Sequence, residues 1–163
     1  MSVIIQGMTQ DAFDAFYRWS IAHHAEELME ELHISRDEAT KAAIAEVDQM
    51  LPDGLNTANH HLMSIIESCS EEIVGFLWTI HEETDGRKQS FLCDFAIWES
   101  KRRRGYGQAA LHWAEKNAAD AGCQESVLFI ADSNKAARAL YEKCGYRDLR
   151  PEGYGKYMVK QLL

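Results

Sequence analysis

The sequence predicts an α/β protein of the α+β kind, in which helices flank a mixed central sheet, built as a single domain over residues 1–163. Three observations lead to this prediction. The 163 residues match the length of one domain with enough chain to bury a core. Segments with apolar residues at helical spacing alternate with short β-rich runs. In chain order these segments give βααβββαβαββ, and helices interleaved with strands are typical of α/β architectures.

The first third of the chain reads as one strand and two helices. Val3–Gln6 is a short apolar run. Over Thr9–Leu32 the apolar residues recur at helical spacing. A capping-box pattern, S-R-D-E, opens a second helix over Ser35–Met50. The turn-forming residues of Leu51–Gly54 are expected to end that helix.

The middle of the chain is rich in strand-forming residues. His61–Ile66 and Ile73–Ile80 are separated by the polar segment Glu67–Glu72, so they are expected to pair as a hairpin. Thr84–Gly86 marks a second turn. Phe91–Trp98 follows as a mostly apolar run, which predicts a central strand buried on both faces.

The last third alternates between the two kinds of element. We expect helices over Gly105–Ala121 and Asn134–Cys144, each followed by a glycine suited to the left-handed conformation that ends a helix. We expect strands over Ser126–Ala131, Tyr146–Leu149 and Tyr157–Val159. These elements complete the predicted order.

Charge is distributed unevenly along the chain. Residues 1–100 hold 5 Lys/Arg against 19 Asp/Glu, whereas residues 101–163 hold 12 against 7, and the whole chain carries −9. The basic part could hold a polyanion and the acidic part a cation, although acidic helix faces can equally be plain solvated surface. The overall negative charge disfavours a long nucleic acid. No apolar run is long enough to span a bilayer and no targeting segment is seen, so a cytoplasmic protein without a membrane partner is expected.

The four cysteines lie far apart, and none belongs to a C-x-x-C pair. A zinc or redox motif therefore has little support, and we expect no metal. Reduced, mostly buried thiols are expected at these positions, which are Cys69, Cys93, Cys123 and Cys144.

A basic loop with two glycines opens one of the predicted helices. It follows the end of the central strand and runs from Arg102 through Gly105 and Gly107 to Gln108. Helix N-termini present unpaired N–H groups and the positive end of the helix dipole, and glycines let a phosphate approach the backbone. The loop fits a pyrophosphate cradle, but on these residues alone a solvated basic loop fits as well. It matches neither a Rossmann nor a Walker A pattern.

A second motif accompanies the first. Asn134 can cap its helix, and Ala137, Leu140, Tyr141 and Cys144 share one face. Together the two stretches resemble the GNAT superfamily of N-acetyltransferases. The first matches the R/Q-x-x-G-x-G/A pattern at Arg102, Gly105 and Gly107. The second matches N-x-x-A-x-x-L-Y-x-x-x-G-F/Y at Asn134, Ala137, Leu140, Tyr141, Gly145 and Tyr146. The resemblance covers residues 60–163 well, and the preceding elements suit it.

The resemblance implies acetyl-CoA as the donor and a primary amine as the acceptor. Tyr141 would protonate the departing thiolate, and Asn134 would contact the pantetheine arm or the loop beside it. A backbone N–H near Ile97 or Trp98 would hold the oxyanion. The cofactor-binding residues expected on this basis are Phe95, Ala96, Ile97, Arg102, Arg103, Arg104, Gly105, Tyr106, Gly107, Gln108, Asn134 and Tyr141. A tyrosine on this helix face could also be a packed core aromatic.

The group that removes the proton of the acceptor amine is left open by the sequence. An amine of pKa about 10.4 is protonated at neutral pH and cannot attack a thioester in that form. Asp94 and Glu99 are the leading candidates, although Asp94 fits a structural carboxylate satisfied by the backbone slightly better. The other candidates are His60, His61 and Glu26, of which the two histidines also read as packing or rim residues.

The leading hypothesis is an acetyl-CoA-dependent N-acetyltransferase acting on a small amine or a peptide amine. The charge distribution favours a cationic acceptor. Two alternatives stay open at this point: a toxin-type relative that acetylates aminoacyl-tRNA, which the acidic residues 1–100 disfavour, and a non-catalytic acyl-CoA-binding or sensory domain. A homodimer is possible. The identity of the acceptor is not encoded in any motif.

Overall fold

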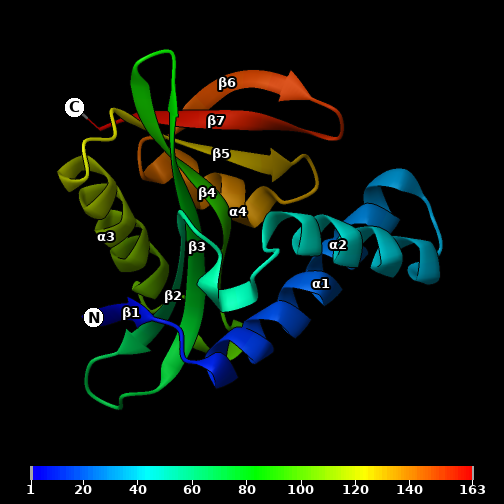
Figure 1. The fold of residues 1–163 in the computed structure, drawn as a ribbon, viewed down its shortest axis with the longest axis horizontal. Coiled ribbons are helices and arrows are strands. Elements are labelled where there is room, and N and C mark those ends of the chain that lie inside the picture. The colour runs from blue at the N-terminus through cyan, green and yellow to red at the C-terminus, as the bar shows by residue number, and fades with distance from the viewer. Residues whose placement is uncertain (1, 163) are drawn as a thin grey trace. The chain divides into compact units, whose positions relative to one another are not determined.

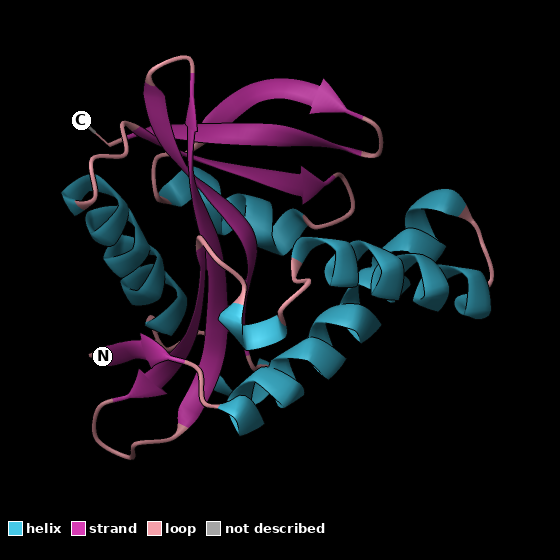
Figure 2. Cartoon of the chain, viewed as in Figure 1, coloured by secondary structure: helices cyan, strands magenta, loops and turns pink. Residues whose placement is uncertain are grey.

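A computed structural model describes residues 2–162. It contains a seven-stranded mixed sheet in the order β1-β2-β3-β4-β5-β7-β6, together with four α-helices (Figures 1 and 2). Neighbouring strands are antiparallel except β4 and β5, which are parallel. The strands are β1 (Val3–Gly7), β2 (His60–Glu67), β3 (Ile73–Thr84), β4 (Arg87–Ile97), β5 (Glu125–Ala131), β6 (Arg147–Glu152) and β7 (Gly155–Gln161). The helices are α1 (Gln10–Leu32), α2 (Arg36–Met50), α3 (Tyr106–Asp120) and α4 (Lys135–Lys143). The predicted fold class and element order are confirmed.

The chain forms two compact units. One contains Met8–Ala58, which is α1, α2 and a short 3-10 turn, and the other contains the sheet with α3 and α4. Within the helical unit, the hydroxyl of Thr9 accepts a hydrogen bond from the Ala12 amide, and Ser35 accepts one from the Glu38 amide in the same way. These caps satisfy N–H groups that the helix itself cannot pair.

The strands β3 and β4 are longer than the apolar runs suggested. They continue past Ile80 to a tight turn at Asp85 and Gly86, whose φ angles of 54° and 77° suit a two-residue hairpin connection. The added length consists of polar pairs such as Glu83 opposite Lys88. Oppositely charged neighbours support such pairing. Hydrophobicity alone therefore did not reveal this extension.

The strand β6 also exceeds its predicted length, because it continues through Pro151 to Glu152. All six of its side chains are exposed, as befits an edge strand with charged residues. The predicted glycines end both helices as expected, since Gly122 and Gly145 have φ angles of 91° and 97°.

The core of the sheet unit lies between the sheet and the two helices α3 and α4. Leu111 of α3 and Tyr141 of α4 belong to the same buried cluster as Leu92, Leu128 and Met158 of the sheet. Both helices therefore cover one face of the sheet, and the N-terminal end of α3 lies beside α4. No helix within residues 2–162 has the length and apolarity needed to cross a bilayer.

The cysteines are all free, as predicted, but the expectation that most are buried is wrong. Only Cys123 is buried, Cys93 and Cys144 are half-buried, and Cys69 is exposed. Cys69 falls in the polar β2–β3 turn, where no core is available to cover it.

Candidate active site

The strands β4 and β5 separate partway along their length. Their parallel register runs from Gln89 opposite Glu125 to Leu92 opposite Leu128 and ends there, although β5 continues beside β7 as far as Ala131. Figure 1 shows the two strands diverging. The edges of Cys93–Ile97 and Phe129–Ala131 therefore face a fork in the sheet instead of pairing with one another.

A β-bulge lies at the point where the fork begins. Trp78 is opposite Asp94 while the next residue of β3, Thr79, is opposite Leu92, so Cys93 is an extra residue in β4. A bulge bends its strand and increases the local twist. This irregularity accounts for the departure of β4 from β5, and sequence reasoning did not foresee it.

The direction of the main-chain groups along β4 follows from its pairing with β3. The Trp98 amide donates to the Val74 carbonyl at 2.8 Å. Because main-chain groups alternate in direction along an antiparallel ladder, the N–H and carbonyl of Ala96 also point toward β3. The main-chain groups of Phe95 and Ile97 then point into the fork. The Phe95 amide donates to the Asp94 carboxylate at 3.0 Å, and the Ile97 carbonyl accepts from Arg102 Nε at 2.9 Å.

An open donor and an open acceptor remain on this edge within residues 2–162: the Ile97 N–H and the Phe95 carbonyl. The Trp98 N–H was the other donor expected to hold the oxyanion of an acyl-transfer reaction, but it is already bonded to the Val74 carbonyl of β3. Ala96 lies on the fork strand without offering its main-chain groups to the fork.

The loop that follows β4 presents a run of unpaired amides. Arg103 and Gly105 have left-handed φ angles of 65° and 85°, and α3 begins directly afterwards at Tyr106. Within the described chain, the amides from Arg103 to Gln108 have no main-chain acceptor. Left-handed residues in such a loop gather successive N–H groups into a concave anion site, and the helix dipole adds to it.

The three arginines of this loop differ in their contacts. Arg102 is tied to the Ile97 carbonyl, which fixes the loop to the end of β4. Arg103 and Arg104 are exposed. The Tyr106 side chain is only 1% exposed and donates to the Glu67 carboxylate, so only its amide faces the loop.

Gly107 joins the loop to the neighbouring elements. A Cβ placed on Gly107 would lie 3.5 Å from Leu140, 3.6 Å from Ile97 and 3.7 Å from Phe95. The start of α3 therefore touches both the fork strand and α4. The predicted cradle, the fork and the second motif come together at this position.

Tyr141 lies beside the fork on α4. Its ring centroid is 6.5 Å from that of Phe95 and 5.7 Å from that of Tyr146. The residue is 7% exposed, and its hydroxyl has no hydrogen-bond partner among residues 2–162. Every described side-chain polar atom that is fully buried does have a partner, so the Tyr141 oxygen must reach solvent.

Burial, and next the nearby charge of Asp94, raises the pKa of Tyr141 well above its ordinary value. The phenol therefore stays protonated at any physiological pH. Cys93, at the bulge, has its pKa raised by the same two causes in the same order. The same surroundings would raise the pKa of any other thiol placed beside the fork.

Asn134 caps α4, as predicted. Its side-chain oxygen accepts a hydrogen bond from the Ala137 amide at 3.3 Å. The oxygen is therefore committed to the helix, and the side-chain amide nitrogen is the group left to donate to a ligand.

The candidate bases are scattered. Asp94 lies at the bulge, whereas Glu99 is exposed in a 3-10 turn after β4. His60 accepts a hydrogen bond from Trp78 Nε1 at 2.8 Å on its Nδ1, and its pKa is lowered mainly by burial. Its lone pair is thus already used. Glu26 is an exposed residue of α1 in the helical unit.

His61 packs against His81, with 4.5 Å between ring centroids and the ring planes tilted by 40°, and burial lowers the pKa of both. Within residues 2–162 no group of three or more His, Cys, Asp or Glu side chains is arranged to hold a metal ion.

A fork that exposes strand edges, followed by an amide-rich helix start, offers a site for an extended ligand that carries phosphate groups. The family model "Acetyltransferase (GNAT) family" matches residues 15–146, which is most of the chain. The chain therefore belongs to the GNAT family of acetyltransferases.

The most similar proteins include two from Bacillus subtilis. The chain is 28% identical to the uncharacterized N-acetyltransferase YycN over 148 residues, covering 91% of this chain and 94% of that protein. It is 27% identical to the uncharacterized N-acetyltransferase YdgE over 146 residues, with coverages of 90% and 92%.

Two solved structures share the fold. The crystal structure of YycN superposes with a TM-score of 0.86 at 27% identity, over 93% of this chain and 96% of that one. The PaiA N-acetyltransferase from Thermoplasma acidophilum, solved in complex with coenzyme A, gives a TM-score of 0.74 at 14% identity over 99% of both chains. At that identity the second comparison supports the fold alone.

Proposed function

We propose that this chain transfers the acetyl group of acetyl-CoA to a primary amine of a small molecule or a peptide, with Tyr141 as the general acid. The observation that carries the proposal is the continuity of three features. The amide-rich loop leads through Gly107 to the fork, and the Tyr141 hydroxyl reaches solvent beside the fork. The thioester carrier, when bound, supplies the activated acetyl group.

The chain's own groups match the parts of this carrier. The amides from Arg103 to Gln108, with Arg104 nearby, suit the pyrophosphate. The Phe95 carbonyl and the Ile97 amide suit the amide groups of the pantetheine arm, which would add to the sheet edge as a short strand does. The five fork residues Cys93–Ile97 span about 16 Å at roughly 3.3 Å per residue. The reacting carbonyl would then lie near the bulge.

Attack of the neutral amine on the thioester carbon forms the C–N bond and a tetrahedral oxyanion. The Ile97 N–H is used by the pantetheine arm in this arrangement, so the oxyanion takes its hydrogen bond from a donor nearer the bulge. Collapse breaks the C–S bond, and the sulfur leaves as a thiolate. Tyr141 gives this thiolate its proton and regains one from solvent, with which its hydroxyl is in contact.

Asp94 is the proposed acceptor of the amine's proton, directly or through water. The Phe95 amide orients this carboxylate at the bulge, close enough to Tyr141 to influence its pKa. The negative charge at this position also favours a cationic acceptor, in line with the acidic composition of residues 1–100. Glu99 is exposed and is the second choice for this role.

Acetyl-CoA consumption with a panel of amines tests the proposal. We expect release of free CoA thiol in the presence of polyamines or peptide amines, and an acetylated product by mass spectrometry. Thiol release without an acetylated amine would indicate hydrolysis. Tight binding of acetyl-CoA with no transfer to any amine would instead favour an acyl-CoA-binding domain and overturn the proposal.

A further inference from the structure

Two carboxylates of the β2–β3 turn hold the chain on either side of the amide-rich loop, residues 102–105. Glu67, the last residue of β2, accepts a hydrogen bond from the Tyr106 phenol, directly after the loop. Glu72, at the other end of the turn, accepts one from Lys101 Nζ at 2.7 Å, directly before the loop. Figure 1 shows the turn and the start of α3 at the same end of the sheet. The loop is therefore tied at both ends to one turn.

The turn that supplies these carboxylates has a defined geometry of its own. The Glu67 amide donates to the Glu72 carbonyl at 2.9 Å, and the Glu71 amide donates to the Glu67 carbonyl at 2.9 Å. Ser68 is bonded to Ser2 twice, by its amide at 3.4 Å and between the two hydroxyls at 3.0 Å. The turn can therefore act as a fixed support for the loop.

The two ties differ in strength. The Tyr106 side chain is buried in the core of the sheet unit, so its hydroxyl is shielded from water and depends on Glu67 as its acceptor. A hydrogen bond to a carboxylate is stronger than one between neutral groups, and a buried hydroxyl without an acceptor is costly. Glu72 and Lys101 form a more exposed pair, in which solvent screens the attraction. The Glu67–Tyr106 bond is thus the stronger tie.

The loop adopts a conformation that needs such support. Arg103 has a left-handed φ angle of 65°, which a residue other than glycine keeps only where the surrounding structure holds it. A loop that had to be ordered by its ligand would lose conformational entropy on binding, which weakens the affinity. A loop held in its binding geometry beforehand avoids that loss.

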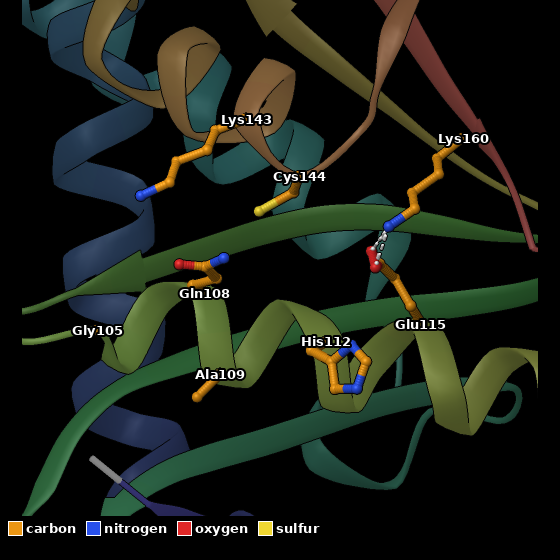
Figure 3. Close-up of a pocket in the computed structure, with 8 residues that line it drawn as sticks. All are labelled: Gly105, Gln108, Ala109, His112, Glu115, Lys143, Cys144 and Lys160. Carbon is orange, nitrogen blue, oxygen red and sulfur yellow. Dashed lines mark hydrogen bonds and ion pairs between the residues drawn. The ribbon is translucent and has the colours of Figure 1, made fainter.

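The Glu67–Tyr106 tie leaves the ligand side of the loop open. Gly105 and Gln108, on either side of Tyr106 in the sequence, line a groove (Figure 3). The Tyr106 side chain does not line this groove, because it packs into the core of the sheet unit. One face of the helix start is therefore anchored, while another stays accessible.

We propose that Glu67 is a positioning residue for acetyl-CoA. By accepting the Tyr106 hydrogen bond, it holds the start of α3 and the loop before it in the geometry from which their amides bind the pyrophosphate. Glu67 acts through Tyr106 and does not touch the carrier itself. The inference rests on the proposed function, because the loop must be the place where the pyrophosphate binds.

Calorimetry with acetyl-CoA, together with steady-state kinetics, tests the inference on four variants. Glu67→Leu cannot accept the hydrogen bond, Glu67→Gln still can through its amide oxygen, and Tyr106→Phe lacks the donor. Tyr146→Phe is the matched control, since the buried Tyr146 phenol also donates to one side chain, that of Ser126 at 2.7 Å. All measurements are made well below the Tm of every variant, so that the folded proteins are compared.

We expect Glu67→Leu to raise the Kd and the KM of acetyl-CoA about tenfold, as the loss of one charge-assisted hydrogen bond implies. Its kcat at saturation should be nearly unchanged, because the groups that carry out the transfer are untouched. Glu67→Gln should restore most of the affinity. In the Tyr106→Phe background, Glu67→Leu should weaken binding no further, since the bond is already absent. Tyr146→Phe should lose stability and keep the wild-type Kd.

An unchanged Kd in Glu67→Leu would overturn the inference and leave the proposed function intact. If Glu67→Leu does not fold, an unchanged Kd in Tyr106→Phe would overturn it equally. Additive losses in the double variant, or binding by Glu67→Gln as weak as by Glu67→Leu, would also overturn it. Failure of the wild type to bind acetyl-CoA would overturn the proposed function and the inference with it.

Discussion

Replacing Tyr141 by Phe removes one oxygen and leaves the packing in place. The ring contacts with Phe95 and Tyr146 are made by atoms that both side chains share. The Tyr141 hydroxyl has no hydrogen-bond partner within residues 2–162 and reaches solvent, so its loss breaks no intramolecular hydrogen bond. We therefore expect the free energy of unfolding to change by less than about 0.5 kcal/mol.

The kinetic effect of the same change should be large. A well-placed general acid contributes about 10²–10⁴ to the rate, which corresponds to roughly 2.7–5.4 kcal/mol of activation free energy. The loss should appear in kcat rather than in the Kd of acetyl-CoA, because the proton is needed only as the thiolate leaves. Thiol release under saturating acetyl-CoA and acceptor measures kcat, and calorimetry measures the Kd.

The neighbouring Tyr146 supplies a control with the opposite expectation. Its hydroxyl donates to Ser126 at 2.7 Å in a buried position. Tyr146→Phe should therefore cost about 1–3 kcal/mol of stability, or several degrees in Tm, with kcat nearly unchanged. If Tyr141→Phe keeps near wild-type kcat on a good acceptor, the proton reaches sulfur from water or another group. Tyr141 would then be a packed aromatic without a catalytic role.

Four other expectations concern the loop, the base, the acceptor and the histidines. Gly105→Val should raise the Kd of acetyl-CoA about tenfold or more, because a φ angle of 85° strains a β-branched residue. The chain should stay folded, since no atom lies within 4 Å of the added Cβ. Arg104→Glu should weaken acetyl-CoA binding through repulsion of phosphate, and unchanged calorimetric affinity in both variants would refute the cradle. Asp94→Asn should lower kcat/KM at neutral pH by about 10²–10⁴, with recovery as the pH approaches the amine's pKa near 10.4, since the amine then needs no base; a profile parallel to wild type would exclude Asp94 as that base. Rising salt should raise the KM of the acceptor, because exposed charges are screened beyond about 8 Å at physiological ionic strength, and a preference for an anionic amine would contradict this. Burial lowers the pKa values of His61 and His81 in the folded chain. Between the usual value near 6.5 and these lower values the unfolded chain binds more protons, so stability falls as the pH falls. Tm should drop from pH 7.5 to 5.5 by more in wild type than in a variant with both histidines replaced by Gln, and equal drops would show that these histidines do not control the pH dependence of Tm.

Local patterns were sufficient to predict the elements of this fold. The caps at Ser35 and Asn134 and the glycines after α3 and α4 lie where the sequence placed them, because each depends on neighbouring residues only. The polar ends of β3 and β4 were not predicted, because they do not depend on neighbouring residues in the sequence. Their pairing depends on the partner strand, and no apolar alternation marks them.

The site was predictable in its residues but not in their contacts. The motif placed Arg102 among phosphate-binding residues, yet its Nε is used to hold the Ile97 carbonyl. The bulge at Cys93 depends on the register between β3 and β4, which no single stretch of sequence contains. Tyr141 and Tyr146 likewise look alike in sequence, and only the structure shows that one hydroxyl is bonded and the other is not.

A crystal structure of the chain grown with acetyl-CoA tests the central claim most directly. We predict the pyrophosphate on the amides from Arg103 to Gln108, the pantetheine arm in the fork beside Phe95 and Ile97, and the sulfur within hydrogen-bonding reach of the Tyr141 hydroxyl. A carrier bound elsewhere, or one whose sulfur lies far from Tyr141 and the bulge, would contradict the account.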